Sequence, residues 1–396
     1  MTTPFPPRIA TLVLLDASGH LLGALPPFEA ATPWWNHVEP LVEAAAQRHG
    51  LRVTVLRLLR AERHHPPGGA VSYLAECDGG APDALAPWDG GLDEQPLRMR
   101  WARPGGPRAD LDWAVAALRR QGLAPDGEPR QLRSWNLSSV WRLPPYWLKA
   151  VPPFFAHEGP LLAALQAEAV PRLVAHDAGR LLLAPAAGED RYGAPPDECE
   201  AMIDLLVDLQ HRWAPRLDEL LALGLPDWRA QAFGRALAEL LPRIALPAED
   251  RATLAAFSAA LPAHFARLAA CGLPDTLLHG DFHPGNFVGD GRRLTLLDWG
   301  DAGIGHPLLD QSAMLTPQSS VNERRLRAHW AAAWRRRHPG ADIEAATRLV
   351  EPLAALRRAV IYQRFVDAIE PAERPYHQDD VPDFLRLAAL LLRAPR

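Results

Sequence analysis

Lysine is almost absent from this sequence of 396 residues. Lys149 is the only lysine, so 41 of the 42 basic residues are arginines. Arginine suffices wherever a positive charge only has to be solvated, but a compact ammonium group and a forked guanidinium bind different partners. The single lysine therefore indicates a site that requires an ammonium group; the alternative is that one lysine remained by chance.

Other scarcities exclude whole classes of protein. No run approaches the ~18 apolar residues of a membrane span, which predicts no membrane partner. Lys and Arg number 42 against 47 Asp and Glu, a net charge of −5, whereas a nucleic-acid binder normally shows a basic excess. The three cysteines form no CxxC pair, and the N-terminus has no basic segment followed by an apolar stretch. We therefore expect a cytoplasmic protein without a zinc site.

The length predicts more than one domain, and the pattern along the chain indicates where they divide. Residues 1–125 alternate strand-like runs with a helical segment that ends at Gly50, followed by a short helix over 113–118, which predicts a small α/β domain. Residues 126–130 are rich in turn formers and are expected to be a linker. Residues 131–396 run from strands to helices, then a hairpin-like insert, then helices, which predicts an α+β fold.

The sequence HGDFHPGN (residues 279–286) carries the strongest chemical signal. Asp281 and Asn286 lie five residues apart in a loop with Gly and Pro, and Asp298 follows the next apolar run. A strand–loop–strand hairpin would bring the three side chains together. Their oxygen atoms suit Mg²⁺, so we expect Asp281 to orient an acceptor hydroxyl while Asn286 and Asp298 hold metal on nucleotide phosphates.

These two segments resemble a known family. HGDFHPGN is similar to the H-x-D-x-x-x-x-N loop of aminoglycoside phosphotransferases and choline-kinase-like enzymes, and LLDWGDAGIGHPLLD (296–310) resembles the segment that follows it. The resemblance implies a bilobal, protein-kinase-like domain with an N-lobe at 131–188 and a C-lobe at 189–396. It also implies that Asp281 is the catalytic base, that ATP and Mg²⁺ are the cofactors, and that Asp310 supports the loop.

Kinase-like N-lobes carry a strand lysine that binds the nucleotide phosphates and pairs with a glutamate of the next helix. Lys149 lies in the strand-like run WLKAV (147–151), and Glu158 begins a predicted helix nine residues later. The resemblance therefore assigns these two residues to the catalytic machinery. Glu168 is the alternative partner.

Two further segments are candidates for nucleotide binding. Ser138 and Ser139 lie between two strand-like runs and could offer hydroxyl and N–H groups to phosphate; an ordinary polar hairpin is the alternative. The segment from Ala184 through Ala187 lies where the family has its interlobe hinge, whose backbone would bind adenine.

The N-terminal region has a second resemblance. Its order of strands and one helix resembles a Nudix domain, whose signature glutamates bind Mg²⁺. Alignment on Gly50 places Glu43 at the arginine position and no acidic residue at the glutamate positions. The resemblance thus implies a domain that has lost the hydrolase metal site, and we expect it to be a non-catalytic cap, regulatory or binding domain.

The sequence as a whole predicts a small-molecule kinase that phosphorylates an amino-sugar, sugar or amino alcohol. The alternative is a catalytically silent, kinase-like binding or regulatory module. An acidic cluster near the C-terminus favours an acceptor that carries an amine, because carboxylates attract cations. This cluster comprises Asp367, Glu370, Glu373, Asp379, Asp380 and Asp383.

Overall fold

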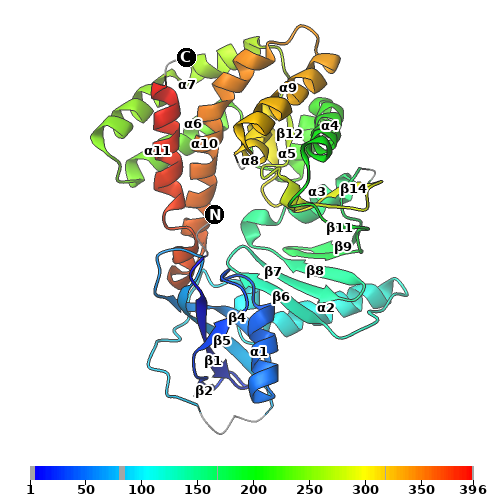
Figure 1. Cartoon of the computed structure of the whole chain (residues 1–396), viewed down its shortest axis with the longest axis vertical. Coiled ribbons are helices and arrows are strands. Elements are labelled where there is room, and N and C mark those ends of the chain that lie inside the picture. The colour runs from blue at the N-terminus through cyan, green and yellow to red at the C-terminus, as the bar shows by residue number, and fades with distance from the viewer. Residues whose placement is uncertain (1–4, 80–84, 167, 317, 395–396) are drawn as a thin grey trace. The chain divides into compact units, whose positions relative to one another are not determined.

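The computed structural model describes residues 5–79, 85–166, 168–316 and 318–394, and its contacts divide the chain into two compact units (Figure 1). Unit 1 comprises Met1–Ala156, Leu173–Pro185 and Arg364–Asp379; unit 2 comprises His157–Arg172, Ala186–Gln363 and Asp380–Arg396. The chain thus passes between the units after residues 156, 172, 185, 363 and 379. Each unit is described by itself.

Unit 1 begins with a five-stranded sheet and one helix, where the sequence predicts strand-like runs and a helical segment. The strand order is β2-β1-β5-β4, with β3 also paired to β1; β1 and β5 are parallel and the other pairs antiparallel. Helix α1 ends at Gly50, whose φ of 65° is the left-handed conformation expected of a terminal glycine. The elements are β1 (Arg8–Leu15), β2 (Leu21–Ala24), β3 (Phe28–Ala30), α1 (Glu39–His49), β4 (Arg52–Ala61) and β5 (Gly69–Asp78).

The second sheet of unit 1 is antiparallel throughout, in the order β6-β7-β8-β10-β9. Its strands are β6 (Arg130–Trp135), β7 (Ser138–Leu143), β8 (Tyr146–Ala150), β9 (Leu173–Asp177) and β10 (Arg180–Leu183). Helix α2 (Gly106–Arg120) is longer than the short helix expected over 113–118, and its Ala114, Ala117 and Leu118 share a core with Trp141 and Leu148. A helix expected in the N-terminal region therefore packs on this second sheet.

Side chains from β6 connect the two sheets. Gln131 binds both backbone groups of Val55: its Oε1 accepts from the N–H at 2.9 Å, and its Nε2 donates to the C=O at 2.7 Å. The Ser134 hydroxyl donates to the C=O of Leu56 at 3.1 Å. The linker expected at 126–130 lies between the two sheets in sequence, and its role as a domain boundary stays a prediction.

Unit 2 is mainly helical, with short strands around the loop of residues 279–286. Strand β12 pairs with β15, and β13 lies between β11 and β14. Within the described residues, no helix is long and apolar enough to cross a membrane. The helices are α3 (Glu158–Ala164), α4 (Pro196–Trp213), α5 (Leu217–Ala222), α6 (Ala230–Leu240), α7 (Ala248–Ala270), α8 (Gln311–Leu315), α9 (Ser320–Arg337), α10 (Ile343–Ala368, whose last five residues belong to unit 1) and α11 (Asp380–Arg393); the strands are β11 (Glu189–Asp190), β12 (Thr276–Leu278), β13 (Phe287–Gly289), β14 (Leu294–Leu296) and β15 (Gly303–Gly305).

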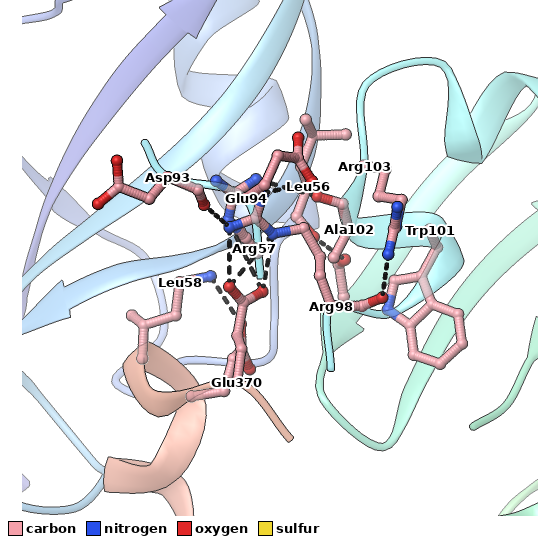
Figure 2. Close-up of polar contacts among 12 residues, drawn as sticks. Leu56, Arg57, Leu58, Asp93, Glu94, Arg98, Trp101, Ala102, Arg103 and Glu370 are labelled. Atoms are coloured by element: carbon pink, nitrogen blue, oxygen red, sulfur yellow. Dashed lines mark hydrogen bonds and ion pairs between the residues drawn. The ribbon is translucent and has the colours of Figure 1, made fainter. Parts of the chain in front are cut away.

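The segment Arg364–Asp379 returns to unit 1 and includes a 3₁₀ helix, η7 (Pro371–Tyr376). Figure 2 shows the carboxylate of Glu370 directed at two guanidinium groups. Arg98 donates to it through Nε and Nη2 at 3.0–3.3 Å, and Nε of Arg57 lies 3.8 Å from Oε1. Glu373 Oε1 accepts the backbone N–H of Leu58 at 2.9 Å.

These contacts correct part of the acidic-cluster prediction. The side chains of Glu370 and Glu373 are only 4% and 3% exposed, because they bind groups of the first sheet and the segment after it. Tyr376 adds an aromatic contact, with its ring centroid 5.5 Å from those of Trp35 and Trp135. Two of the six carboxylates are therefore structural and cannot attract an acceptor from solvent.

The buried ion pair predicts a large cost for Glu370→Gln. This change leaves Arg57 and Arg98 buried without their carboxylate, and we expect a loss of about 3–5 kcal/mol in the free energy of unfolding, measured in urea. Glu219→Gln is the matched control, since Glu219 also binds an arginine, Arg216, through two hydrogen bonds but is 57% exposed. The control should lose less than about 1 kcal/mol. Equal losses would contradict the structural role of Glu370.

Burial also gives Glu373 a defined pH signature, because it raises the pKa of this carboxyl from 4.5 to about 8. Between these values the folded chain retains a proton that the unfolded chain releases, so this group makes stability fall as pH rises, by at most about 1.4 kcal/mol per pH unit. Glu373→Gln, which cannot ionise, should therefore gain stability relative to the wild type from pH 4.5 to 8 and no further above pH 8. Urea unfolding across this range is the measurement; a constant difference between the two proteins would show that Glu373 does not titrate there.

Candidate active site

A buried carboxylate fixes the start of the loop 279–286. Asp310, at the end of the 3₁₀ helix Pro307–Asp310, accepts the backbone N–H of His279 at 3.0 Å and of Gly280 at 2.8 Å. It also accepts a hydrogen bond from Nε2 of Gln210 on α4 at 3.0 Å. Burial raises the pKa of Asp310, while Arg357, His279 and the two amides act in the opposite direction. Asp310 therefore lies where a loop-supporting carboxylate is expected.

His279 connects this loop with the segment that carries Asp298. Its Nε2 donates to the C=O of Leu297 at 2.8 Å, while its Nδ1 accepts the N–H of Asp281 at 3.3 Å. This pattern is that of a neutral ring, and burial lowers the pKa of His279 in agreement. The ring packs edge-on against Trp299, with centroids 4.7 Å apart. His279 thus positions the backbone around both aspartates.

Asp281 and Asn286 are in direct contact. The Asn286 amide donates from Nδ2 to the backbone C=O of Asp281 at 2.8 Å and to its Oδ2 at 3.2 Å. His283 Nδ1 accepts the N–H of Gly285, and its Nε2 lies 3.3 Å from Asp281 Oδ2. Burial opposes ionisation of Asp281, but His283, His279 and Arg358 lower its pKa to about 2. The side chain, 43% exposed, is therefore an accessible carboxylate.

The hairpin β13–β14 brings Asp298 to the same region of unit 2 as Asn286. Phe287 pairs with Leu296, and the N–H of Leu297 donates to the C=O of Asn286 at 2.7 Å. Asp298 follows at once, with an exposed side chain and a φ of 60°. In the part of the chain that the structure describes, it is the only non-glycine residue with a positive φ. This conformation costs about 1 kcal/mol or more, and such strain gathers at functional sites.

Two arginines of α10 contact the loop 279–286, and neither was predicted from the sequence. Arg357 is 2% exposed; it donates from Nη1 to the C=O of Gly280 at 3.2 Å and from Nη2 to the C=O of Asp301 at 2.8 Å. It thereby joins the loop 279–286 to the segment 296–301. Arg358 lies with Nη2 3.9 Å from Oδ1 of Asp281. Both sit in an arginine-rich helix without a motif, so no local signal could have distinguished them.

Glu158 and Lys149 belong to different units. Glu158 begins α3 in unit 2, is 2% exposed, and accepts the N–H of Trp299, the residue after Asp298, at 3.1 Å. Lys149 lies in the middle of β8 in unit 1, paired with Val140 and Leu181. The alternative partner, Glu168, binds the guanidinium of Arg212.

The other residues predicted to bind nucleotide differ in burial. Ser138 and Ser139 begin β7, are buried, and accept hydrogen bonds from the indoles of Trp135 and Trp141. Phosphate binding by these serines stays a prediction. Ala184 is buried and Ala187 is exposed, and the boundary between the two units falls between them, after residue 185.

Unit 2 also contains a cavity of about 350 Å³, called here the C-lobe cavity. Arg358 is part of its wall and therefore links it to Asp281. The cavity is bounded by α8, α9, α10 and α11, and its lining residues are Leu308, Gln311, Ser312, Leu315, Thr316, Glu323, Arg327, Thr347, Val350, Glu351, Ala354, Ala355, Arg358, Phe384, Leu387 and Leu391.

Comparison with known proteins identifies the class of this protein. The model of the Phosphotransferase enzyme family matches residues 139–348, more than half of the chain, and the chain belongs to that family. The matched range contains Lys149, the loop 279–286 and Asp298. The protein is thus a phosphotransferase. The match begins at residue 139, so the Nudix-like resemblance of the N-terminal region receives no support from it.

Solved structures agree on the fold. A choline/ethanolamine kinase family protein from Mesorhizobium loti matches with a TM-score of 0.50 and 15% identity, over 72% of this chain and 95% of that one. An aminoglycoside 2'-phosphotransferase-IIIa, solved as its GDP complex, matches with a TM-score of 0.50 and 14% identity, over 72% and 98% of the two chains. No curated protein gives a significant match.

The packing around Gly280 predicts a strong effect of Gly280→Ala. With φ at +91°, an added Cβ would lie 2.1 Å from the Asp301 carbonyl oxygen and 2.5 Å from Arg357 Nη2. Gly291→Ala is the matched control, because Gly291 has a φ of +82° and nothing within 4 Å of the added Cβ. We expect the control to lose about 1–2 kcal/mol of unfolding free energy from strain alone. Gly280→Ala should lose about 1–3 kcal/mol more. Equal losses would show that the contact between loop and segment is not tight.

Proposed function

We propose that this phosphotransferase transfers the γ-phosphoryl group of ATP to a hydroxyl of a small molecule, with Asp281 as the catalytic base. The observation that carries the proposal is the contact of Asp281 with Asn286, together with the hairpin that carries Asp298 to the same region. The acceptor oxygen would bond to phosphorus as the bond to the leaving ADP oxygen breaks, and the hydroxyl proton would pass to Asp281.

The low pKa of Asp281 suits this role. A carboxyl with a pKa of about 2 is ionised at neutral pH and accepts a hydrogen bond from the acceptor hydroxyl. It is too weak a base to remove the proton before bond formation. In a loose transition state, however, the hydroxyl loses its proton late, so orientation of the hydroxyl is the main contribution.

Asn286 and Asp298 fit a magnesium ion. The amide nitrogen of Asn286 is held by Asp281, which leaves its Oδ1 as the ligand atom, and Asp298 supplies an exposed carboxylate. Oxygen ligands of this kind are those Mg²⁺ prefers. When bound, the ion would neutralise charge on the phosphates.

Lys149 and Glu158 are the remaining residues that we assign to the reaction. We assign Lys149 to the α- and β-phosphates because it is the only lysine in a chain whose other Lys or Arg residues are all arginines. Glu158 is proposed to belong to the catalytic machinery of unit 2, where its Oε1 holds the backbone next to Asp298. The segment from Ala184 through Ala187 is proposed to bind adenine through its backbone.

A silent binding module is the second candidate function. Retention of Lys149, Asp281, Asn286 and Asp298 together argues against it, because a module without turnover has no need of all four. ADP release in the presence of a panel of sugars, aminoglycosides, amino acids, amino alcohols and neutral alcohols separates the two functions. The region 1–125 is proposed to be non-catalytic and to hold the segment Arg364–Asp379.

The proposed roles predict two distinct kinds of defect. Asp281→Asn should lower kcat by about 10²–10⁴-fold and leave the Kd of Mg·ATP nearly unchanged, since it removes the base while the backbone C=O of residue 281 still holds the Asn286 amide. Asp298→Ala and Lys149→Arg should raise that Kd about tenfold or more, because each changes a group assigned to metal or phosphate. Calorimetric titration and ADP release, with an acceptor that the panel identifies, provide the two readouts.

Asp290→Asn is the matched control for these variants. Asp290 lies in the turn between β13 and β14 and accepts the N–H groups of Arg292 and Arg293, a role that Asn also fills. It should change neither kcat nor the Kd. Near-normal turnover of Asp281→Asn would remove Asp281 from the role of base, and unchanged Mg·ATP binding by Asp298→Ala would remove the metal assignment.

A further inference from the structure

The residues that line the C-lobe cavity indicate which kind of acceptor it could bind. Half of its sixteen lining residues are Leu, Val, Ala or Phe, and three of the others are Ser or Thr. Its volume of about 350 Å³ lies within the range of small-molecule sites, which are mostly apolar with a few polar groups. A cavity of this kind offers an apolar ligand a favourable exchange of water for hydrocarbon contacts.

The charges of the cavity cancel one another. Its charged lining residues are Glu323, Arg327, Glu351 and Arg358, two of each sign. Arg327 Nη2 lies 2.8 Å from Glu323 Oε1 and 2.9 Å from Glu351 Oε1, so one guanidinium binds both carboxylates. Arg327 thereby offsets part of the attraction that either carboxylate could offer a cationic ligand.

The remaining charge, Arg358, faces the base. Its Nη2 lies 3.9 Å from Asp281 Oδ1, and its guanidinium carbon lies 5.5 Å from the ring centroid of Phe384, another cavity residue. A molecule that reached Asp281 from this cavity would therefore pass a positive charge. Because Arg358 offsets part of the negative charge of Asp281, an ammonium group beside the reacting hydroxyl gains less Coulomb attraction than it would from a lone carboxylate.

We infer that the acceptor is an uncharged alcohol with a largely apolar body that binds in the C-lobe cavity, and that amines are disfavoured. The inference rests on the proposed function, since it concerns the acceptor of that reaction. It replaces the amine expected from the sequence, two of whose supporting carboxylates, Glu370 and Glu373, are buried in unit 1. Arg327 and Arg358 are the residues that determine this preference.

Pairs of alcohols test the inference. Each pair consists of a neutral alcohol of 8–12 carbon and oxygen atoms, about the size that such a cavity accommodates, and the analogue in which one methyl group is replaced by an ammonium group. Saturation-transfer NMR measures binding of both members to the wild type, and ADP release measures kcat/KM. We expect the neutral member to be favoured about tenfold or more in both measurements.

Two variants locate the effect. Arg327→Met leaves Glu323 and Glu351 without their cation, so it should move the preference toward the amine by about tenfold, while Glu323→Gln, the matched control, should not. Ala355→Phe, which places a ring in the cavity, should abolish binding of the neutral alcohol and leave Mg·ATP binding unchanged. Mg·ATP titration also shows whether each variant is folded.

The outcomes separate the two proposals. Neutral alcohols that bind without being phosphorylated would support the inference about the cavity and contradict the proposed function. Turnover with equal or better use of the amines would support the proposed function and overturn the inference. Binding of no alcohol, or binding unaffected by Ala355→Phe, would overturn the assignment of the cavity as the acceptor site.

Discussion

The hydrogen bonds from the His279 and Gly280 amides to Asp310 are the constraint on which the rest of the site depends. A single buried carboxylate fixes two consecutive peptide planes, and with them the direction in which the chain enters Asp281. The same carboxylate is held by Gln210, so α4 shares in this constraint. A buried charge is costly unless its hydrogen bonds are satisfied, so loss of any one of these hydrogen bonds is expected to destabilise the site.

Around this fixed point the two motifs are joined through main-chain groups. His279 binds the C=O of Leu297, Arg357 binds those of Gly280 and Asp301, and Glu158 binds the N–H of Trp299. These hydrogen bonds fix the main chain around Asp281 and Asp298, while the two carboxylate side chains remain accessible to solvent. In the proposed reaction, preorganisation of this kind would let these carboxylates act without rearrangement of the surrounding chain.

Features that depend on residues close together in the sequence could be predicted from the sequence alone. The spacing from Asp281 to Asn286 and the apolar run before Asp298 predicted a hairpin, and Gly50 predicted a helix end. Arg357 and Arg358 carried no such signal, because each contacts residues more than 50 positions away and arginine is frequent throughout the chain. The prediction that Glu370 and Glu373 attract a cationic acceptor was wrong for the same reason. Their partners, Arg98 and Leu58, are 272 and 315 residues away in the sequence.

The return of Arg364–Asp379 to unit 1 has a consequence for biosynthesis. A ribosome that adds about 5–20 residues per second completes Arg98 roughly 15–55 s before it reaches Glu370, 272 residues later. Throughout that interval Arg57 and Arg98 of the nascent N-terminal region lack the Glu370 carboxylate that they contact in the folded protein. Its final packing must wait until nearly the whole chain has emerged, so the first part of this protein to be made is among the last to reach its native state.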